Sequence, residues 1–390
     1  MLFTKEKILT LLADYAARNR QTWDSLWQRR SIGRIAISVT PNEETLQYAK
    51  QLCSQISWEE PDSKPVKWTP EWRQNLLEQI AVILAGLLVP GDGSKLSLGP
   101  PRFVHGQSQG ICDLFGARVE SQPDGNYFVH PLSPDKCSLK DLKVKELSSS
   151  LYWGAVDYIR YARLITGDIF CFGGPVMTSS FDTTNYLLST TVLMEWVYTE
   201  KETLHSLLNT VTDTIIAMLG ELQQAAGGAF LNAPYNLGCQ TGAFGLCSEC
   251  RSLVSAEIYE EFEAPYLRRI GEKIGPYSIH SCGSWERTVP SAIADPNLRQ
   301  MQGQIRENDL AALCKLSSGR MTFGIGPSIN LPPRYTWQNM ESYYAFILQT
   351  VPSIQPLGIS VAENDLALWN RLCDDFKRPE NKLPLYSLRF

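Results

Sequence analysis

Two side chains with the chemistry of zinc ligands stand two residues apart in the C-terminal half of the chain, His280 and Cys282. They follow the apolar run 277–279, and Gly283 comes directly after them. Residues i and i+2 of an extended backbone project on the same side, so the imidazole and the thiolate can converge on one ion. One nitrogen and one sulfur donor suit zinc. The alternative interpretation is a core histidine beside a buried thiol.

A second pair of thiols, Cys247 and Cys250, forms a C-x-x-C sequence, with Glu249 and Cys239 as neighbours. Thiols gathered in turns of a long chain with few cysteines indicate metal binding or catalysis rather than disulfides. Together with the H-x-C pair they would give a Cys3His tetrahedron. A closed set of four ligands is usually structural, so a catalytic version would use only one of the C-x-x-C thiols. The alternative is a turn that contains small residues.

The elements that must position these residues alternate between strands and helices. Strands are predicted for short apolar runs that end in Gly, Pro or polar residues: 34–39, 168–173, 229–233, 277–279, 298–301, 321–325 and 357–361. Strands that alternate with helices of ten or more residues indicate parallel βαβ units. No G-x-G-x-x-G follows the first strand, which weakens the open nucleotide-binding sheet. The pattern therefore predicts an α/β protein with a (β/α)8 TIM barrel, whose functional face is at the carboxyl ends of the strands.

Four helices are predicted from their starts and their hydrophobic period. Apolar residues recur every 3.6 positions after Thr203, and Thr69 followed by Pro70 is a favourable helix start. Ser255 is expected to cap a helix that Pro265 kinks, and Asn308 to cap another.

The first part of the chain is longer and less regular than one βα unit requires. We interpret residues 1–150 as an N-terminal helical extension that carries the first strand or strands of the barrel and a strand or hairpin near 117–130. Residues 151–390 then form the main body of the barrel, and the whole is one structural domain.

Composition excludes several classes of protein. The 390 residues are 44% hydrophobic and 20% charged, with a formal net charge of −5, which does not fit a disordered chain. An acidic balance also disfavours nucleic acid as a partner. No window of about 18 uncharged apolar residues exists, and charges occupy the N-terminus where a secretory signal would be apolar. We expect a cytoplasmic protein that does not bind membranes.

Three segments of the chain resemble one known family. They are the Gly174-Pro175 turn with the helices after it, the segment 253–266 that contains S-A-E-I-Y-E-E-F-E-A-P-Y, and the His280-Ser-Cys282-Gly string. All three are similar to sequences of the uroporphyrinogen decarboxylase superfamily, which also contains zinc-dependent corrinoid methyltransferases. The H-x-C-G string matches the methyltransferase branch. The resemblance implies a barrel and makes His280 and Cys282 zinc ligands.

Two departures from the family pattern affect what can be carried over. The methyltransferases take a third ligand from a Gly-Cys-Gly in the last strand, where this chain has Leu357-Gly-Ile-Ser360. A hydroxyl is a poor zinc ligand, so Cys247 or Cys250 is the expected replacement. The decarboxylases carry an R-Q-A-G-R segment that clamps carboxylates, and nothing in this chain matches it.

The function that the resemblance implies is methyl transfer from a corrinoid protein to a small thiol that zinc activates. The chain contains no D-x-H-x-x-G string, so the corrinoid is expected on a separate protein. The predicted substrate-binding residues are Asn232, Tyr235, Gln304, Trp285 and Ser360.

Two other functions stay open at this point. One is a decarboxylase of a tetrapyrrole or other polycarboxylate, which needs several arginines in the pocket; its candidates are Arg34, Arg163, Arg251 and Arg306. The other is a barrel subunit that holds a structural zinc and catalyses nothing.

Overall fold

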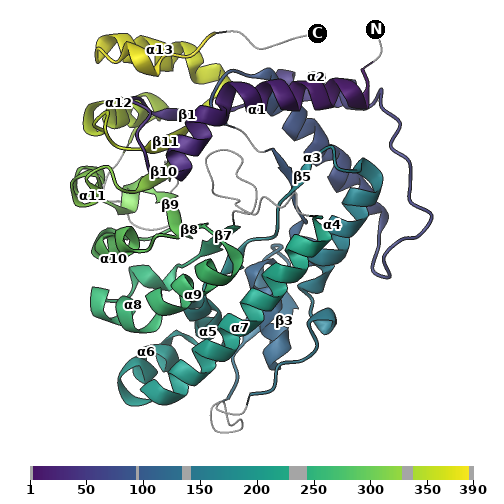
Figure 1. The fold of residues 1–390 in the computed structure, drawn as a ribbon, viewed down its shortest axis with the longest axis vertical. Coiled ribbons are helices and arrows are strands. Elements are labelled where there is room, and N and C mark those ends of the chain that lie inside the picture. The colour runs from purple at the N-terminus through teal and green to yellow at the C-terminus, as the bar shows by residue number, and fades with distance from the viewer. Residues whose placement is uncertain (1–2, 94–95, 134–141, 228–243, 327–336, 386–390) are drawn as a thin grey trace.

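Parallel strands form a ring that is surrounded by helices, as predicted for a (β/α)8 barrel (Figure 1). The computed structural model describes residues 3–93, 96–133, 142–227, 244–326 and 337–385. Seven strands pair in the order β1–β11–β10–β9–β8–β7–β6. Their bounds are Ala36–Thr40, Leu357–Ala362, Thr322–Gly326, Leu298–Gln304, Tyr277–Ser281, Phe244–Cys247 and Met177–Thr178.

The ring is closed by short strands. β2 (Ser97–Leu98) pairs in parallel with β5 (Cys171–Phe172), and one bridge joins Ser38 of β1 to Gly93. β6 follows β5 after residues 173–176 and pairs with β7 on its other side. β5 and β6 therefore share one position of the barrel. In the described residues, each contact in this half of the ring contains one or two pairs of residues. Each contact between neighbouring strands in the series β7, β8, β9, β10, β11 and β1 contains three to five pairs.

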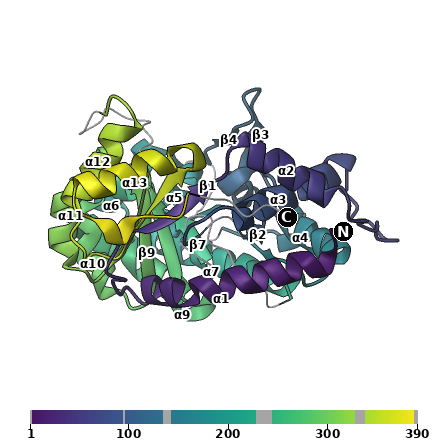
Figure 2. The same cartoon turned by 90° about the horizontal axis from the view of Figure 1, so that it is seen from above.

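Helices cover the outside of the ring. The N-terminal set is α1 (Lys5–Trp27), α2 (Glu43–Cys53), α3 (Pro70–Leu88) and α4 (Trp153–Thr166). The middle set is α5 (Ser180–Leu188), α6 (Thr190–Thr199), α7 (Lys201–Ala225), α8 (Ala256–Phe262) and α9 (Ala264–Ile274). The last set is α10 (Val289–Ala294), α11 (Leu310–Ser317), α12 (Met340–Thr350) and α13 (Leu366–Asp375). In Figure 2 this last set lies at one end of the molecule and α2, α3 and α4 at the other.

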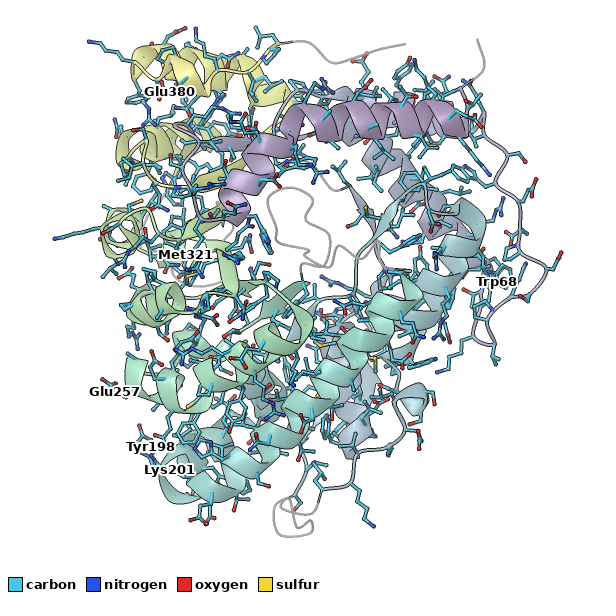
Figure 3. All side chains as sticks on the ribbon, in the orientation of Figure 1. Trp68, Tyr198, Lys201, Glu257, Met321 and Glu380 are labelled. Carbon is cyan, nitrogen blue, oxygen red and sulfur yellow. The ribbon has the colours of Figure 1, made fainter. Side chains whose placement is uncertain are left out.

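The core fills the layer between strands and helices. Met321, labelled in Figure 3 just before β10, is fully buried, whereas Tyr198 at the outer edge of α6 is 72% exposed. The apolar stripe predicted after Thr203 is confirmed, because Leu204, Leu207 and the following members of the stripe are buried along α7.

The predicted helix starts are confirmed with one exception. Pro70 begins α3, and the Ser255 hydroxyl accepts a hydrogen bond from the Ile258 amide at the start of α8. The predicted single helix with a kink at Pro265 is wrong, because the chain leaves the helix at Glu263 and Pro265 stands in the first turn of a second helix, α9, where its missing amide costs nothing. The predicted cap Asn308 is wrong: Asp309 caps α11 by accepting the Ala312 amide.

The strand predictions are confirmed wherever the apolar runs were long. Only β2, β6 and β7 were missed, and the predicted strand 229–233 lies outside the described residues. The placement of Cys247 in a loop is wrong, since it is the last residue of β7.

The N-terminal part contributes α1 to α3, two barrel strands and the predicted hairpin, β3 (Arg118–Ser121) paired antiparallel with β4 (Tyr127–His130). The division at residue 150 stays a prediction. Arg29 ties this part to the barrel, because its guanidinium donates to the carbonyls of Ile293, Asp295 and Leu298.

The helices of the described residues include none that is both long and apolar enough to cross a membrane.

Candidate metal centre at the ends of strands β7 to β9

Three neighbouring strands place one side chain each in a single row near their carboxyl ends. Cys247 of β7 pairs in register with His280 of β8, and His280 pairs with Gln302 of β9. Paired residues of parallel strands project on the same side of the sheet. Cys247 and His280 are each only 7% exposed, so both side chains are held in packed surroundings at the face where barrels build their sites.

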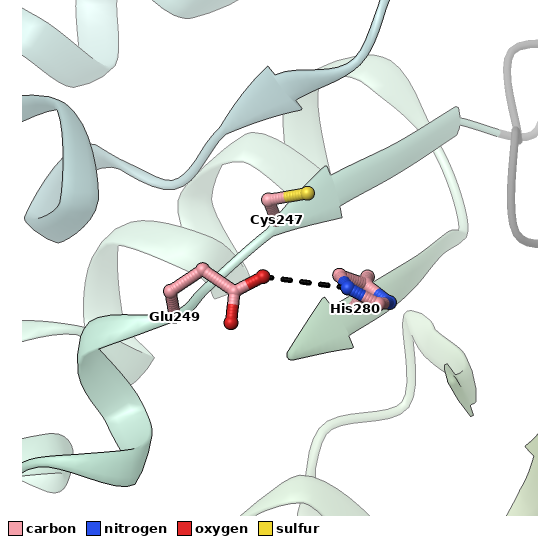
Figure 4. A group of neighbouring side chains, drawn as sticks. All are labelled: Cys247, Glu249 and His280. Carbon is pink, nitrogen blue, oxygen red and sulfur yellow. Dashed lines mark ion pairs between the residues drawn. The ribbon is translucent and has the colours of Figure 1, made fainter. Parts of the chain in front are cut away.

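Three potential metal ligands converge on this row. Donor atoms of Cys247, Glu249 and His280 all lie within 4.8 Å of one another. Figure 4 shows the Cys247 thiol, the Glu249 carboxylate and the His280 ring directed toward the same space. His280 Nε2 lies 3.3 Å from Glu249 Oε1, and the Glu249 side chain is 38% exposed. The group is therefore buried on its strand side and accessible on its loop side.

The two ring nitrogens of His280 have different partners. Nδ1 faces the amide oxygen of Gln302, which only accepts, so Nδ1 carries the proton and donates. Nε2 is then the nitrogen directed toward Glu249. A partner of this kind fixes the orientation and tautomer of a metal-binding histidine.

Cys282 completes the surroundings of Nε2. Its sulfur lies 3.3 Å from His280 Nε2, and its backbone amide donates to Glu249 Oε2 at 2.6 Å. The Gln304 side-chain amide donates to the same sulfur at 3.5 Å. The structure thus brings His280 and Cys282 together, as the i, i+2 spacing predicted, and places Gln304 beside Cys282.

Charge in the group is balanced between Glu249 and His280. Burial lowers the pKa of His280, but hydrogen bonds to Cys282 and Glu249 outweigh it and raise the pKa to about 9. Burial raises the pKa of Glu249, yet the bonds from His280 and from the Cys282 amide lower it overall. The protein alone therefore holds an imidazolium–carboxylate pair, and a cation that displaces the imidazole proton would meet the same carboxylate.

The donor set fits zinc. It offers one or two thiolates, an imidazole nitrogen and a carboxylate oxygen, all of them zinc ligands in proteins. Ligands of a tetrahedral zinc about 2.0 to 2.3 Å from the ion stand about 3.5 Å apart, and separations of 3.3 Å to 4.8 Å are close to that value. The outer partner that zinc-bound histidines require is present in Gln302.

The remaining predicted ligand, Cys250, is not among the three converging residues. It is 4% exposed, and its thiol bonds the Asp182 carboxylate instead. Burial and that carboxylate raise the pKa of the Cys250 thiol. Burial and then the neighbouring Glu263 raise the pKa of Asp182. The potential ligand that this turn places beside Cys247 is therefore Glu249, rather than the second cysteine.

The predicted substrate residues are dispersed. Ser360 is exposed on β11 in register with Ser38, whereas Trp285 is 1% exposed and packs on Phe323 with ring centroids 5.7 Å apart. Asn232 and Tyr235 lie outside the described residues.

The arginines proposed for a decarboxylase do not gather in one pocket. Arg34 pairs with Asp92, and Arg163 on α4 pairs with Asp168. Arg251 is buried and donates to Thr288. The side chain of Arg306 is not described.

Three residues of the centre, Glu249, Gln302 and Asp182, were not chosen from the sequence as ligand or support. Glu249 was treated only as a neighbour of the C-x-x-C, although it stands two residues after Cys247, the same spacing that selected His280 and Cys282. Asp182 gives no sequence signal, because its role depends on packing between α5 and the turn after β7.

Comparisons with known proteins agree with this architecture. The family model described as uroporphyrinogen decarboxylase (URO-D) matches residues 111–302. A methylated-thiol–coenzyme M methyltransferase of Methanosarcina mazei is 30% identical over 119 residues, which are 30% of this chain and 29% of that enzyme. The similarity thus spans less than a third of that enzyme's length.

Solved structures extend the likeness in fold. A methyltransferase from Methanosarcina mazei superposes with a TM-score of 0.56 and 12% identity, over 92% of this chain and 98% of that one. A B12-independent methionine synthase from Shewanella, solved with selenomethionine, aligns over 63% of this chain and 67% of its own, with 11% identity and a TM-score of 0.36. Residues 111–302 therefore carry a uroporphyrinogen decarboxylase (URO-D) family domain, and part of the chain is similar in sequence to a methylated-thiol–coenzyme M methyltransferase.

Proposed function

We propose that this protein is a zinc-dependent methyltransferase that moves a methyl group from a corrinoid, carried by a separate protein, to a small thiol. The observation that carries the proposal is the convergence of Cys247, Glu249 and His280 within 4.8 Å at the carboxyl ends of the barrel strands. Cys282, 3.3 Å from His280 Nε2, is the fourth proposed ligand.

Each side chain of the centre has its own proposed role in binding zinc or substrate. Zinc, when bound, lowers the pKa of a thiol ligand and keeps it as a reactive thiolate at neutral pH. Cys247 and His280 would hold the ion from the buried side, and Gln302, which accepts a hydrogen bond from Nδ1, leaves Nε2 as the nitrogen that would face the ion. Glu249, on the exposed side, occupies the direction from which a substrate would approach.

The substrates are proposed from separate observations. The Methanosarcina mazei relative is named for methylated thiols and coenzyme M, which supports a thiol acceptor. The absence of a D-x-H-x-x-G string in the 390 residues supports a corrinoid on a partner protein. Gln304 beside Cys282 and Ser360 on β11 are the described residues proposed to contact substrate; Asn232, Tyr235 and Trp285 stay sequence predictions.

Metal content tests the centre directly. The purified protein is expected to bind about one zinc per chain, and His280→Ala and Cys247→Ser to lose it. Cys250→Ser is the matched control and is expected to retain zinc, because Cys250 stands outside the converging group. Elemental analysis measures the zinc content of each folded variant. A His280→Ala variant with the zinc content of the wild type would contradict the assignment of His280 as a ligand.

A transfer assay separates an enzyme from a zinc-containing structural subunit. Methylcobalamin and a small thiol are incubated with the protein, and thioether formation is measured. Methylation that disappears in His280→Ala supports the proposed reaction. A protein that holds zinc but methylates no thiol across a panel of acceptors, with its corrinoid partner present, would favour the non-catalytic alternative.

A further inference from the structure

The turn that follows β7 is held by a buried carboxylate from another element. Asp182 stands in the first turn of α5 and is 2% exposed. One of its oxygens accepts the Glu249 amide at 2.6 Å, and the other accepts the Cys250 amide at 2.8 Å. Two backbone bonds to adjacent residues fix the direction of the peptide between them.

The same carboxylate also binds the Cys250 thiol. Cys250 is thereby directed toward α5, while Glu249, one residue earlier, is directed toward His280. Neither residue could exchange these directions without breaking bonds to Asp182.

The neighbouring residue of the turn is fixed separately. The Ser248 amide donates to the His280 carbonyl at 2.8 Å, and its hydroxyl donates to Glu263, a buried carboxylate where α8 meets α9. Asp182 and Glu263 therefore accept hydrogen bonds from different residues of the turn.

The intrinsic preference of zinc for thiolates would favour Cys250 over Glu249 as a ligand. Thiolates bind zinc strongly, and two cysteines in C-x-x-C spacing commonly bind one ion. With Cys250 in place of Glu249, the ion would be enclosed by three sulfurs and one nitrogen, the kind of set found in structural sites. The local sequence favours that set, and the contacts of Asp182 oppose it.

We propose that Asp182 is a positioning residue that selects the ligands of the metal centre, holding Cys250 away so that Glu249 faces the ion. The inference rests on the proposed zinc centre. It implies that Asp182 keeps the centre in a form with an oxygen ligand, which a substrate thiol can replace more readily than a protein thiolate.

The test counts sulfur ligands by zinc X-ray absorption spectroscopy. In the wild type we expect at most two sulfurs, from Cys247 and Cys282. Asp182→Asn, which keeps the shape but replaces one of the two acceptor oxygens with a donor, is expected to gain one sulfur. Asp182→Asn combined with Cys250→Ser is expected to return to the wild-type number. Glu263→Gln is the matched control, since it removes the other carboxylate of the turn, and its sulfur count is expected to stay unchanged.

Circular dichroism first establishes that each variant is folded, and Asp182→Ala gives a second removal of the carboxylate. A sulfur count that stays at the wild-type value in both folded Asp182 variants would overturn the inference, as would loss of zinc from them. If the wild type binds no zinc, the proposed metal centre itself fails. These outcomes are distinct.

Discussion

At the scale of single residues, the centre depends on which atom of each side chain faces the ion. Gln302 fixes the orientation of the His280 ring, because its amide oxygen accepts a hydrogen bond from Nδ1 and Nε2 then faces Glu249 and Cys282. Partners of this kind commonly change metal affinity by about 10- to 100-fold when they are removed.

We therefore expect Gln302→Leu to weaken zinc binding by about 10- to 100-fold while the fold is retained. Competition with a chromophoric chelator measures the change. Gln302→Glu restores an acceptor for Nδ1 and is expected to bind zinc at least as well as the wild type. Equal affinities for the wild type and Gln302→Leu would contradict the role given to this residue.

Local spacing predicted part of this centre and missed the rest for a physical reason. The i, i+2 alternation of a strand was enough to bring His280 and Cys282 together. The same rule relates Cys247 to Glu249, but the C-x-x-C pattern drew attention to Cys250 instead. Asp182, which accepts the amides of Glu249 and Cys250 and is proposed to decide which of them faces the metal centre, stands more than 60 residues earlier in the chain, and short-range patterns contain no such information.

At the scale of elements, Asn308 shows how a residue typical of helix caps serves another purpose. It is fully buried; its side-chain oxygen accepts the Trp285 amide at 2.8 Å, and its nitrogen donates to the carbonyls of Gly283 and Gln304. Asn308 thus joins the loop that follows β8, which carries Cys282, to the end of β9 at Gln304.

Asn308→Ala is expected to destabilise the protein more than Asp309→Ala does. The first change leaves buried backbone groups without partners, at about 2 kcal/mol or more. The second removes an ordinary N-cap, at about 1 kcal/mol. Urea denaturation of both variants compares the two free energies of unfolding, and a larger loss in Asp309→Ala would contradict the assignment.

The elements that the sequence predicted best are those with long, repetitive signals. The buried stripe of α7 and the apolar runs of β8 to β11 were recognised from period and length alone. β2 and β6, with two residues each, are too short to carry a period. They are strands only because the ring places partners beside them, and this is tertiary information.

At the scale of the whole molecule, the closure of the ring relies on side chains where the strand ladder is sparse. Asp92, 7% exposed, accepts the Ile37 amide at 2.9 Å and an Arg34 guanidinium nitrogen at 2.6 Å. Its backbone amide also donates to the Ile37 carbonyl at 2.7 Å. This residue joins β1 to the segment that leads into β2.

Asp92→Asn is expected to lower the free energy of unfolding by about 3 kcal/mol, because it leaves Arg34 partly buried without its counter-charge. Chemical denaturation measures the loss. Hydrogen exchange is expected to accelerate most at amides of β1 and β2. Glu120→Gln, in an exposed ion pair of the hairpin, is the control and is expected to have no measurable effect. Exchange that accelerates equally around the whole ring would contradict this account of the closure.

The unequal number of paired residues around the ring has a consequence for how large ligands enter the barrel. β8, which carries His280, stands opposite β1 in the ring, so the single bridge between Ser38 of β1 and Gly93 lies across the barrel from the proposed metal centre. We expect the barrel to widen first at the contacts between β1, β2 and β5, which contain one or two pairs of residues each. A large ligand would widen the barrel there while Cys247, His280 and Gln302 stay aligned on the longer ladder of β7, β8 and β9. Entry of the ligand would then be a separate event from release of a bound ion.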